Sequence, residues 1–187
     1  MAIDFPEHPF WDFSLKLYRE KAVAPACLAL QNDYAADVNI LLYCCWLGVA
    51  GAGRLSEADM RRVVAAVDAW QSDMIRPLRR LRQRLKQGFE PVPEDTCQRL
   101  RQAIQLLEID AEHVEQLLLA ELAPVCFVDE RAAGDRARVA AANLVVYLTV
   151  LGVVRNNDVD KHLSVMLNAC FSDLDASAAL AGLSDET

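Results

Sequence analysis

Residues 56–86 read SEADMRRVVAAVDAWQSDMIRPLRRLRQRLK, and this stretch decides the fold class. Ser56 is a preferred N-cap residue, and Asp59 follows it by three positions, a spacing typical of a helix start. Apolar residues then recur every three or four positions, which is the period of an α-helix. Because the period continues through Pro77, the sequence predicts one long helix kinked at that proline, or two helices nearly in line.

A second long amphipathic stretch, residues 94–123, follows a turn at residues 87–93 that contains glycine and two prolines. Its apolar residues alternate steps of four and three, the heptad pattern of paired helices. They are Leu100, Ile104, Leu107, Ala111, Val114 and Leu118. Two such helices joined by a short turn predict a long antiparallel helical hairpin.

Two stretches of 16 residues, 38–53 and 139–154, carry no charged side chain. Each is shorter than the roughly 20 residues that a helix needs to span a bilayer. They therefore favour helices buried on all sides over transmembrane helices. The first of these helices should end at Leu47, terminated by Gly48 and the Gly-Ala-Gly run at residues 51–53. The pattern Asn-x-x-x-Tyr-x-x-x-Leu-Gly-Val occurs in both, 104 residues apart, which suggests two similar core helices side by side around a pseudo-twofold axis.

The remaining pattern predicts shorter helices near residues 10–19, 25–34 and 160–171, the last capped by Asp158 or Asp160. The whole chain is predicted to be an all-α, single-domain bundle of about six or seven helices. The domain should cover residues 1–172, and residues 173–187 should form an acidic, frayed tail.

Composition limits the location and the class of the protein. The net charge of −8 argues against a surface that binds nucleic acid all over. The six cysteines contain no C-x-x-C pair, and the first residues do not resemble a signal peptide. The sequence therefore predicts a cytoplasmic protein with free thiols and no transmembrane segment.

The opening residues carry a family resemblance. The run Phe-Trp-Asp-Phe-Ser at residues 10–14, then Cys-Leu-Ala-Leu-Gln at 27–31 and Asp-Val-Asn at 37–39, resembles a family of uncharacterised proteobacterial proteins known as a domain of unknown function. The resemblance implies a helical bacterial protein with no assigned activity, and no site residue follows from it.

No catalytic residue, metal site or cofactor is predicted. The three histidines are far apart, and no nucleophile elbow or phosphate-binding loop occurs. Asp158 and Asp160 form a D-x-D pair that could hold Mg²⁺ and a diphosphate, although helix capping is the simpler interpretation. Another candidate is a polar pocket lined by the two Asn–Tyr pairs, whose simpler interpretation is a hydrogen-bonded core. The pocket residues are Asn39, Tyr43, Asn143, Tyr147, Asp158 and Asp160.

The tip of the predicted hairpin is basic. Between residues 76 and 104 there are eight basic residues and three acids, which leaves the rest of the chain at −13. The basic residues are Arg76, Arg79, Arg80, Arg82, Arg84, Lys86, Arg99 and Arg101. A turn centred on Glu90 should place Arg79 and Arg80 near Arg99 and Arg101, so that like charges gather. Either acids of the last helix and tail dock here, or an anionic partner binds.

For function, the abundance of amphipathic surface and the lack of catalytic motifs favour a non-enzymatic interaction or adaptor protein. Its partner would be an acidic protein or another anion bound by the hairpin end. The alternative is a helical enzyme or small-ligand binder that uses the polar pocket. Peripheral membrane attachment through the basic end ranks third.

Overall fold

The computed structural model describes residues 5–123, 132–176 and 178–183, and these residues form helices and no β-strand. The helices are α1 (Pro9–Tyr18), α2 (Val23–Tyr34), α3 (Val38–Val49), α4 (Glu57–Trp70), the π-helical segment η1 (Gln71–Ile75), α5 (Arg76–Lys86), α6 (Glu94–Glu121), α7 (Ala133–Val150), α8 (Asn157–Cys170) and α9 (Ala178–Ala181). The predicted all-α bundle is confirmed.

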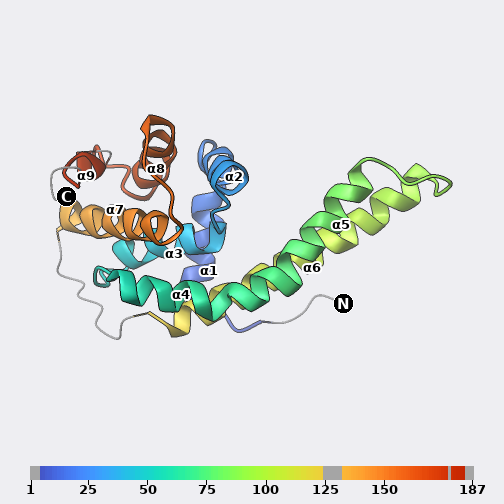
Figure 1. Cartoon of the computed structure of the whole chain (residues 1–187), viewed down its shortest axis with the longest axis horizontal. Coiled ribbons are helices and arrows are strands. Elements are labelled where there is room, and N and C mark those ends of the chain that lie inside the picture. The colour runs from blue at the N-terminus through green and yellow to red at the C-terminus, as the bar shows by residue number, and fades with distance from the viewer. Residues whose placement is uncertain (1–4, 124–131, 177, 184–187) are drawn as a thin grey trace.

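The molecule has two parts (Figure 1). We call the first part the body: it consists of α1–α4, α7–α9 and the C-terminal half of α6. The second part, the arm, consists of α5, residues 87–93 and the N-terminal half of α6, and it projects from the body as a helical hairpin. The predicted hairpin is therefore present, and it stands apart from the core that α3 and α7 form.

Helices α3 and α7, which contain most of the two uncharged stretches, lie at the centre of the body and pack antiparallel. The C-terminal part of α3 meets the start of α7, where Gly48 lies against Ala140 and the backbone of Arg136. At the other end, the Tyr147 hydroxyl of α7 accepts a hydrogen bond of 2.7 Å from the backbone N–H of Asp37. Two neighbouring, buried core helices were predicted. The lack of charge on α3 and on α7 from residue 139 onward explains why both can be covered on most sides.

Of the glycines predicted to end α3, Gly51 does so, whereas Gly48 lies inside the helix. The helix continues to Val49, and Gly51, with a φ of 76°, supplies the left-handed turn after it. A Cβ atom on Gly48 would lie 2.6 Å from the Cβ of Ala140 and 2.7 Å from the carbonyl oxygen of Arg136. The glycine therefore sets the close approach of the two central helices.

We expect Gly48→Ala to destabilise the protein by about 1–3 kcal/mol, because the backbone of α7 must move away and the gain in helix propensity is smaller than that cost. Gly53→Ala is the matched control, since a Cβ there meets nothing within 4 Å. Urea denaturation of both variants measures the effect. Equal midpoints for the two would contradict the close packing of α3 on α7.

The long helix predicted for residues 56–86 is continuous in direction but changes its hydrogen bonding. Ser56 and Asp59 form the expected capping box. The irregularity lies in the π-helical segment η1 (Gln71–Ile75), and α5 follows with Pro77 in its first turn. Proline is tolerated there because its missing N–H falls where the α-helical ladder is already interrupted.

The C-terminal part differs from the prediction in two ways. Asn156, and not Asp158 or Asp160, caps α8, since its side chain accepts hydrogen bonds from the first turn. The chain after Ser172 was expected to be frayed, yet Ala176 and Leu180 are buried in the main core. Small apolar residues among the acids give this segment a face that packs on α7.

Candidate functional site

The arm and the body are joined by an ion-pair cluster. Arg79 of α5 donates from Nε to Glu108 at 2.9 Å and from Nη2 to Glu112 at 2.8 Å. Arg82 donates to both carboxylate oxygens of Glu108. The third guanidinium nitrogen of Arg79 binds Gln31 of α2 at 2.5 Å, so that one arginine connects both arm helices to the body.

This pairing corrects the predicted register of the hairpin. Arg79 pairs with residues of α6 that lie well beyond Arg99 and Arg101, and acids of α6 itself form ion pairs with three of the eight predicted basic residues, Arg79, Arg82 and Arg99. Side chains on a helix lean toward its N-terminus. In an antiparallel pair, Arg79 leans toward the body and Glu108 leans toward the tip, and the two therefore meet across an offset that backbone positions alone do not predict.

The other predicted basic residues lie on the outer surface of the arm. Arg76, Arg80 and Lys86 are exposed and form no ion pair with any residue that the structure describes. Arg84 donates to the Gly88 carbonyl and lies over the ring of Phe89. The last two, Arg99 and Arg101, bind Asp95 and Gln98 respectively. The acids of α8, Asp158 and Asp160, do not reach them, because this helix packs at the far end of the body (Figure 1).

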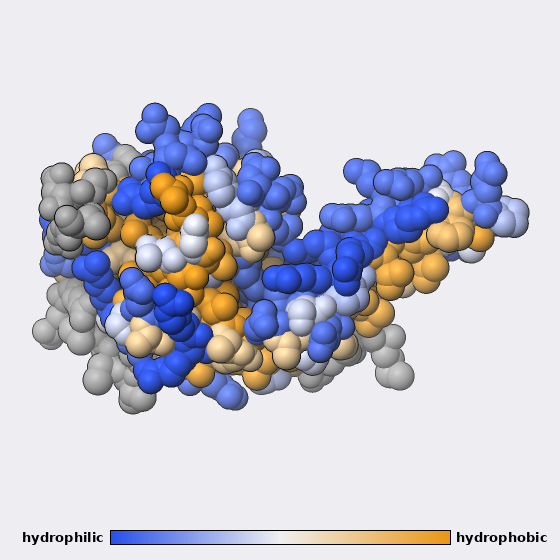
Figure 2. Space-filling view, in the orientation of Figure 1, coloured by the Kyte–Doolittle hydropathy of each residue, from blue (hydrophilic) through white to orange (hydrophobic). Residues whose placement is uncertain are grey.

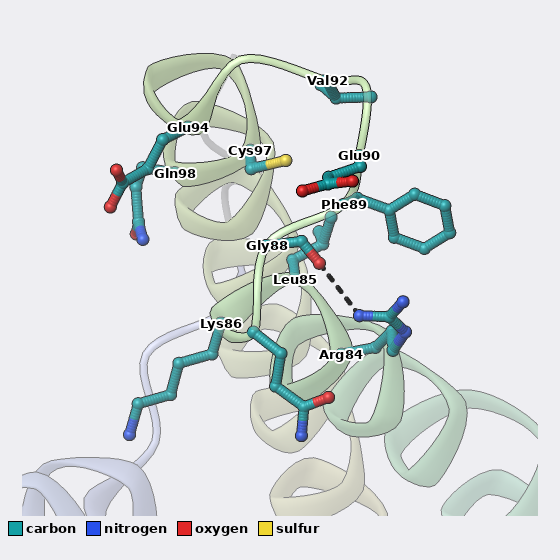
Figure 3. A pocket seen from close by; sticks show the side chains of 11 residues that line it. Arg84, Leu85, Lys86, Gly88, Phe89, Glu90, Val92, Glu94, Cys97 and Gln98 are labelled. Atoms are coloured by element: carbon teal, nitrogen blue, oxygen red, sulfur yellow. Dashed lines mark hydrogen bonds between the residues drawn. The ribbon is translucent and has the colours of Figure 1, made fainter.

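A shallow hollow of about 740 Å³ occupies the tip of the arm. Figure 3 shows Cys97 of α6 beside the 88–92 loop, with Arg84 reaching the carbonyl oxygen of Gly88. Phe89 and Val92 are about half exposed there. The tip therefore presents an arginine and apolar side chains together, and the described residues place no acid–base pair suited to catalysis in it.

A second cavity, of about 600 Å³, lies between the body and the arm, and we call it the body–arm groove. Trp11, Leu15 and Tyr18 of α1 form part of its apolar wall. Opposite them, Arg79, Arg82, Glu108, Glu112 and Gln116 form its polar side. Asn39 is the one residue of the predicted polar pocket that lines this groove.

A buried polar network lies behind the groove. Asn39 donates to Glu115 at 2.7 Å and accepts from Gln116 at 2.8 Å. Gln71, at the start of the π-helical segment, donates to Asp37 at 2.5 Å and more weakly to Glu115. Glu115 is fully buried. The network joins α3, η1 and α6, so these three elements keep their relative positions only while its members stay hydrogen bonded.

The acids of this region have shifted pKa values for different reasons. Burial, and then the neighbouring Asp37 carboxylate, raise the pKa of Glu115 far above its ordinary value. Burial raises the pKa of Glu112 to about 7, although Arg79 opposes the shift. Burial also disfavours ionisation of Glu108, but the hydrogen bonds from Arg82 and Arg79 outweigh it and hold its pKa below the ordinary value.

The remaining residues of the predicted pocket serve other contacts. Asn143 accepts from the backbone N–H of Leu55 at 2.8 Å, and so holds the chain that enters α4. Tyr43 packs against Phe10, and Asp160 forms two hydrogen bonds with Arg155. Asp158 is exposed at the start of α8. The prediction that Asn39 and Asn143 each have a hydrogen-bond partner is confirmed. The two Asn–Tyr pairs do not line one pocket, because they contact different segments of the chain.

The cysteines of the described residues form no disulfide. Five of the cysteines are free thiols: Cys27, Cys44, Cys45, Cys97 and Cys170. Cys126 lies outside the described residues. Within residues 5–123, 132–176 and 178–183, no group of histidine, cysteine and acidic side chains could hold a metal ion. Over the same residues, every helix is too short or too polar to cross a membrane.

Sequence reasoning missed the three glutamates of α6 as site residues. Glu108, Glu112 and Glu115 follow each other at steps of four and three, and therefore share a side of the helix. This spacing of the glutamates can be read from the sequence. The prediction used the neighbouring apolar heptad instead, although Leu100 and Leu107 of that heptad are half exposed.

Comparison with known proteins gives a family and no activity. A family profile described as "Protein of unknown function (DUF2390)" matches residues 9–119, which span α1 to α6 and include the whole arm and the groove. The searches of curated proteins and of solved structures found no match.

Proposed function

The chain belongs to this family of proteins of unknown function, and on that premise we propose, from the geometry alone, that it is a non-enzymatic interaction protein. The arm binds an acidic amphipathic helix of a partner protein. The observation that carries the proposal is a row of half-exposed leucines along an arm on which Arg76, Arg80 and Lys86 have no ion-pair partner among the described residues.

The half-exposed leucines of the arm leave an apolar surface in contact with water. Leu81, Leu100 and Leu107 are 55%, 52% and 50% exposed. Figure 2 shows hydrophobic residues gathered along one edge of the arm, with hydrophilic residues along the other. The arm is only two helices thick, and α5 contributes no fully buried side chain. A third helix laid along this edge would bury the leucines as in a helix-in-groove complex.

Charge favours an acidic occupant. Arg84 lies three residues from Leu81 and so shares its side of α5, while Arg80 and Arg76 precede it at steps of four. A helix with leucines on one face and glutamates beside them would match both features. A second arm from another copy would bring the same cations together, and nucleic acid would leave the leucines uncovered, so both fit less well.

The test uses a synthetic helical peptide of about 21 residues with leucine at the a and d positions and glutamate at e and g. Fluorescence anisotropy should show binding to the intact protein, weakened about tenfold or more between low and moderate salt. Leu81→Ser with Leu100→Ser should abolish binding, and so should Arg76→Glu with Arg80→Glu and Arg84→Glu.

The choice of arginines follows from the ion pairs. Arg79 is left intact because reversing it would bury an unpaired charge against Glu108 and unfold the cluster. Reversal of Arg61 and Arg62, which are exposed on α4, is the matched control and should leave binding unchanged.

Three results contradict the proposal. The first is equal binding of a peptide with lysine in place of glutamate, and the second is unchanged binding by the triple arginine variant. The third is a dimer in analytical ultracentrifugation that the leucine variants abolish, because this dimer assigns the apolar row to a second copy.

A further inference from the structure

The body–arm groove gathers apolar side chains that the rest of the fold leaves exposed. Leu15 of α1, Leu28 of α2 and Ile109 of α6 are 38%, 44% and 39% exposed. All three line this groove, together with Trp11 and Tyr18 of α1. The volume of about 600 Å³ lies in the range of small-molecule pockets. Apolar surface that three helices turn toward one hollow is typical of a ligand groove.

The charges that line this groove are positive on balance. They belong to three cations and two acids: Arg79, Arg82, Lys86, Glu108 and Glu112. Burial raises the pKa of Glu112 to about 7, so this acid carries only about half of a negative charge near neutral pH. The buried acids Asp37 and Glu115 lie behind the lining and are not part of it. The groove therefore keeps a positive charge that its own acids do not offset.

The cationic end of the groove has open hydrogen-bond donors. Arg82 and Lys86 are four residues apart on α5 and so share a side of the helix. Arg82 binds Glu108 through Nε and Nη2, which leaves its Nη1 without a partner among the described residues, and its side chain is 27% exposed. Lys86 is exposed, and in Figure 3 its side chain extends away from the 88–92 loop. Both cations are therefore accessible to one ligand.

We propose that the body–arm groove binds a carboxylate with a hydrocarbon chain, the chemistry of a medium-chain fatty acid. The carboxylate lies between Arg82 and Lys86, and the chain packs against Leu15, Leu28 and Ile109. An ionised carboxylate accepts charge-assisted hydrogen bonds from both cations. The chain removes from water the apolar side chains that are now exposed. An alkylamine would add a further cation beside Lys86, and a small inorganic anion would leave the apolar wall uncovered.

This inference goes beyond the proposed function and uses another side of the arm, because Leu81 and Leu100 do not line the groove. The probe is octanoate, compared with octan-1-ol and octylamine, which have the same chain and a neutral or a positive end. Isothermal titration calorimetry with the full chain should show octanoate binding at least tenfold more tightly than either of the other two compounds.

Variants separate the two ends of the ligand. Lys86→Gln should weaken octanoate about tenfold and leave the weak binding of octan-1-ol unchanged, because only the carboxylate uses the charge. Lys161→Gln removes the same charge at an exposed position of α8 and is the matched control. Leu28→Ser should weaken octanoate and octan-1-ol alike, about fivefold, because both bury the same chain against this side chain. Far-UV circular dichroism melts check that the variants fold.

Competition distinguishes this site from the partner surface. Saturating octanoate should leave the binding of the acidic peptide unchanged, and octanoate binding without any peptide binding would refute the proposed function alone. The fatty-acid proposal is overturned by any of four results. These are no binding of octanoate, equally tight binding of octan-1-ol or octylamine, equal affinity of Lys86→Gln and Lys161→Gln for octanoate, or displacement of the peptide by octanoate, which assigns the groove to the partner protein.

Discussion

Leu148→Asp is expected to unfold the protein at 25 °C. Leu148 is fully buried in the core on α7. The substitution removes a large buried side chain, at a cost of about 2–5 kcal/mol, and places a carboxyl group in an apolar surrounding without a partner. The sum is comparable to the whole stability of a domain of this size, about 5–15 kcal/mol.

The neighbouring residue provides the control for this prediction. Thr149 is exposed on the same helix, and Thr149→Asp should change the unfolding free energy by less than about 1 kcal/mol. Near-UV circular dichroism and urea denaturation distinguish the two variants. A folded, cooperative Leu148→Asp protein would mean that α7 is not the central helix of the core.

The central helices could be predicted because they lack charge. A helix that has no charged residue over 16 positions is apolar on nearly all sides, so it is stable only when nearly all of its sides are buried. The internal repeat, whose two copies lie in the uncharged stretches, also predicted that α3 and α7 lie side by side. The repeat did not reveal that its two glycines differ, since Gly48 lies at a helix contact and Gly152 has a φ of 74° after α7. That difference depends on the crossing point of the helices, which local sequence does not determine.

The hairpin was predicted, but its charge pairing was not. Counting residues from Glu90 treats side chains as if they stood at right angles to the helix axis. The actual pairing of Arg79 with Glu108 and Glu112 depends on the lean of long side chains in opposite directions. It also depends on which face of α6 packs against α5. The face with the glutamates turns toward α5, and the face with the leucines remains exposed.

The groove could not be predicted, because it is formed between elements far apart in the chain. Leu15 and Ile109 are brought to the same cavity only by the packing of α1 against α6. Neither residue is part of a motif. Whether an exposed apolar side chain lines a cavity is a property of the folded structure, and single exposed apolar side chains are common on protein surfaces.

The buried carboxyl of Glu115 makes the stability of the protein depend on pH. Its pKa is raised in the folded state, so at neutral pH the folded protein holds a proton that the unfolded chain releases. The stabilisation from this proton is complete below the unfolded pKa of about 4.3. It is lost progressively as the pH rises through neutrality toward the raised folded value. Wild-type stability should therefore fall between about pH 5 and pH 9.

Glu115→Gln should remove much of that fall. The amide has the shape of the protonated acid: its oxygen can accept from Asn39 and its N–H₂ can donate to Asp37, which keeps the network intact. At pH 8.5 the variant should exceed the wild type by about 1–3 kcal/mol in unfolding free energy, and near pH 5 the two should be similar. Urea denaturation across this range gives both curves. Glu121→Gln, on an exposed residue of the same helix, should reproduce the wild-type curve. If Glu115→Gln shows the same pH dependence as the wild type, Glu115 is ionised in the folded protein at neutral pH, and the raised pKa of its carboxyl group must be abandoned.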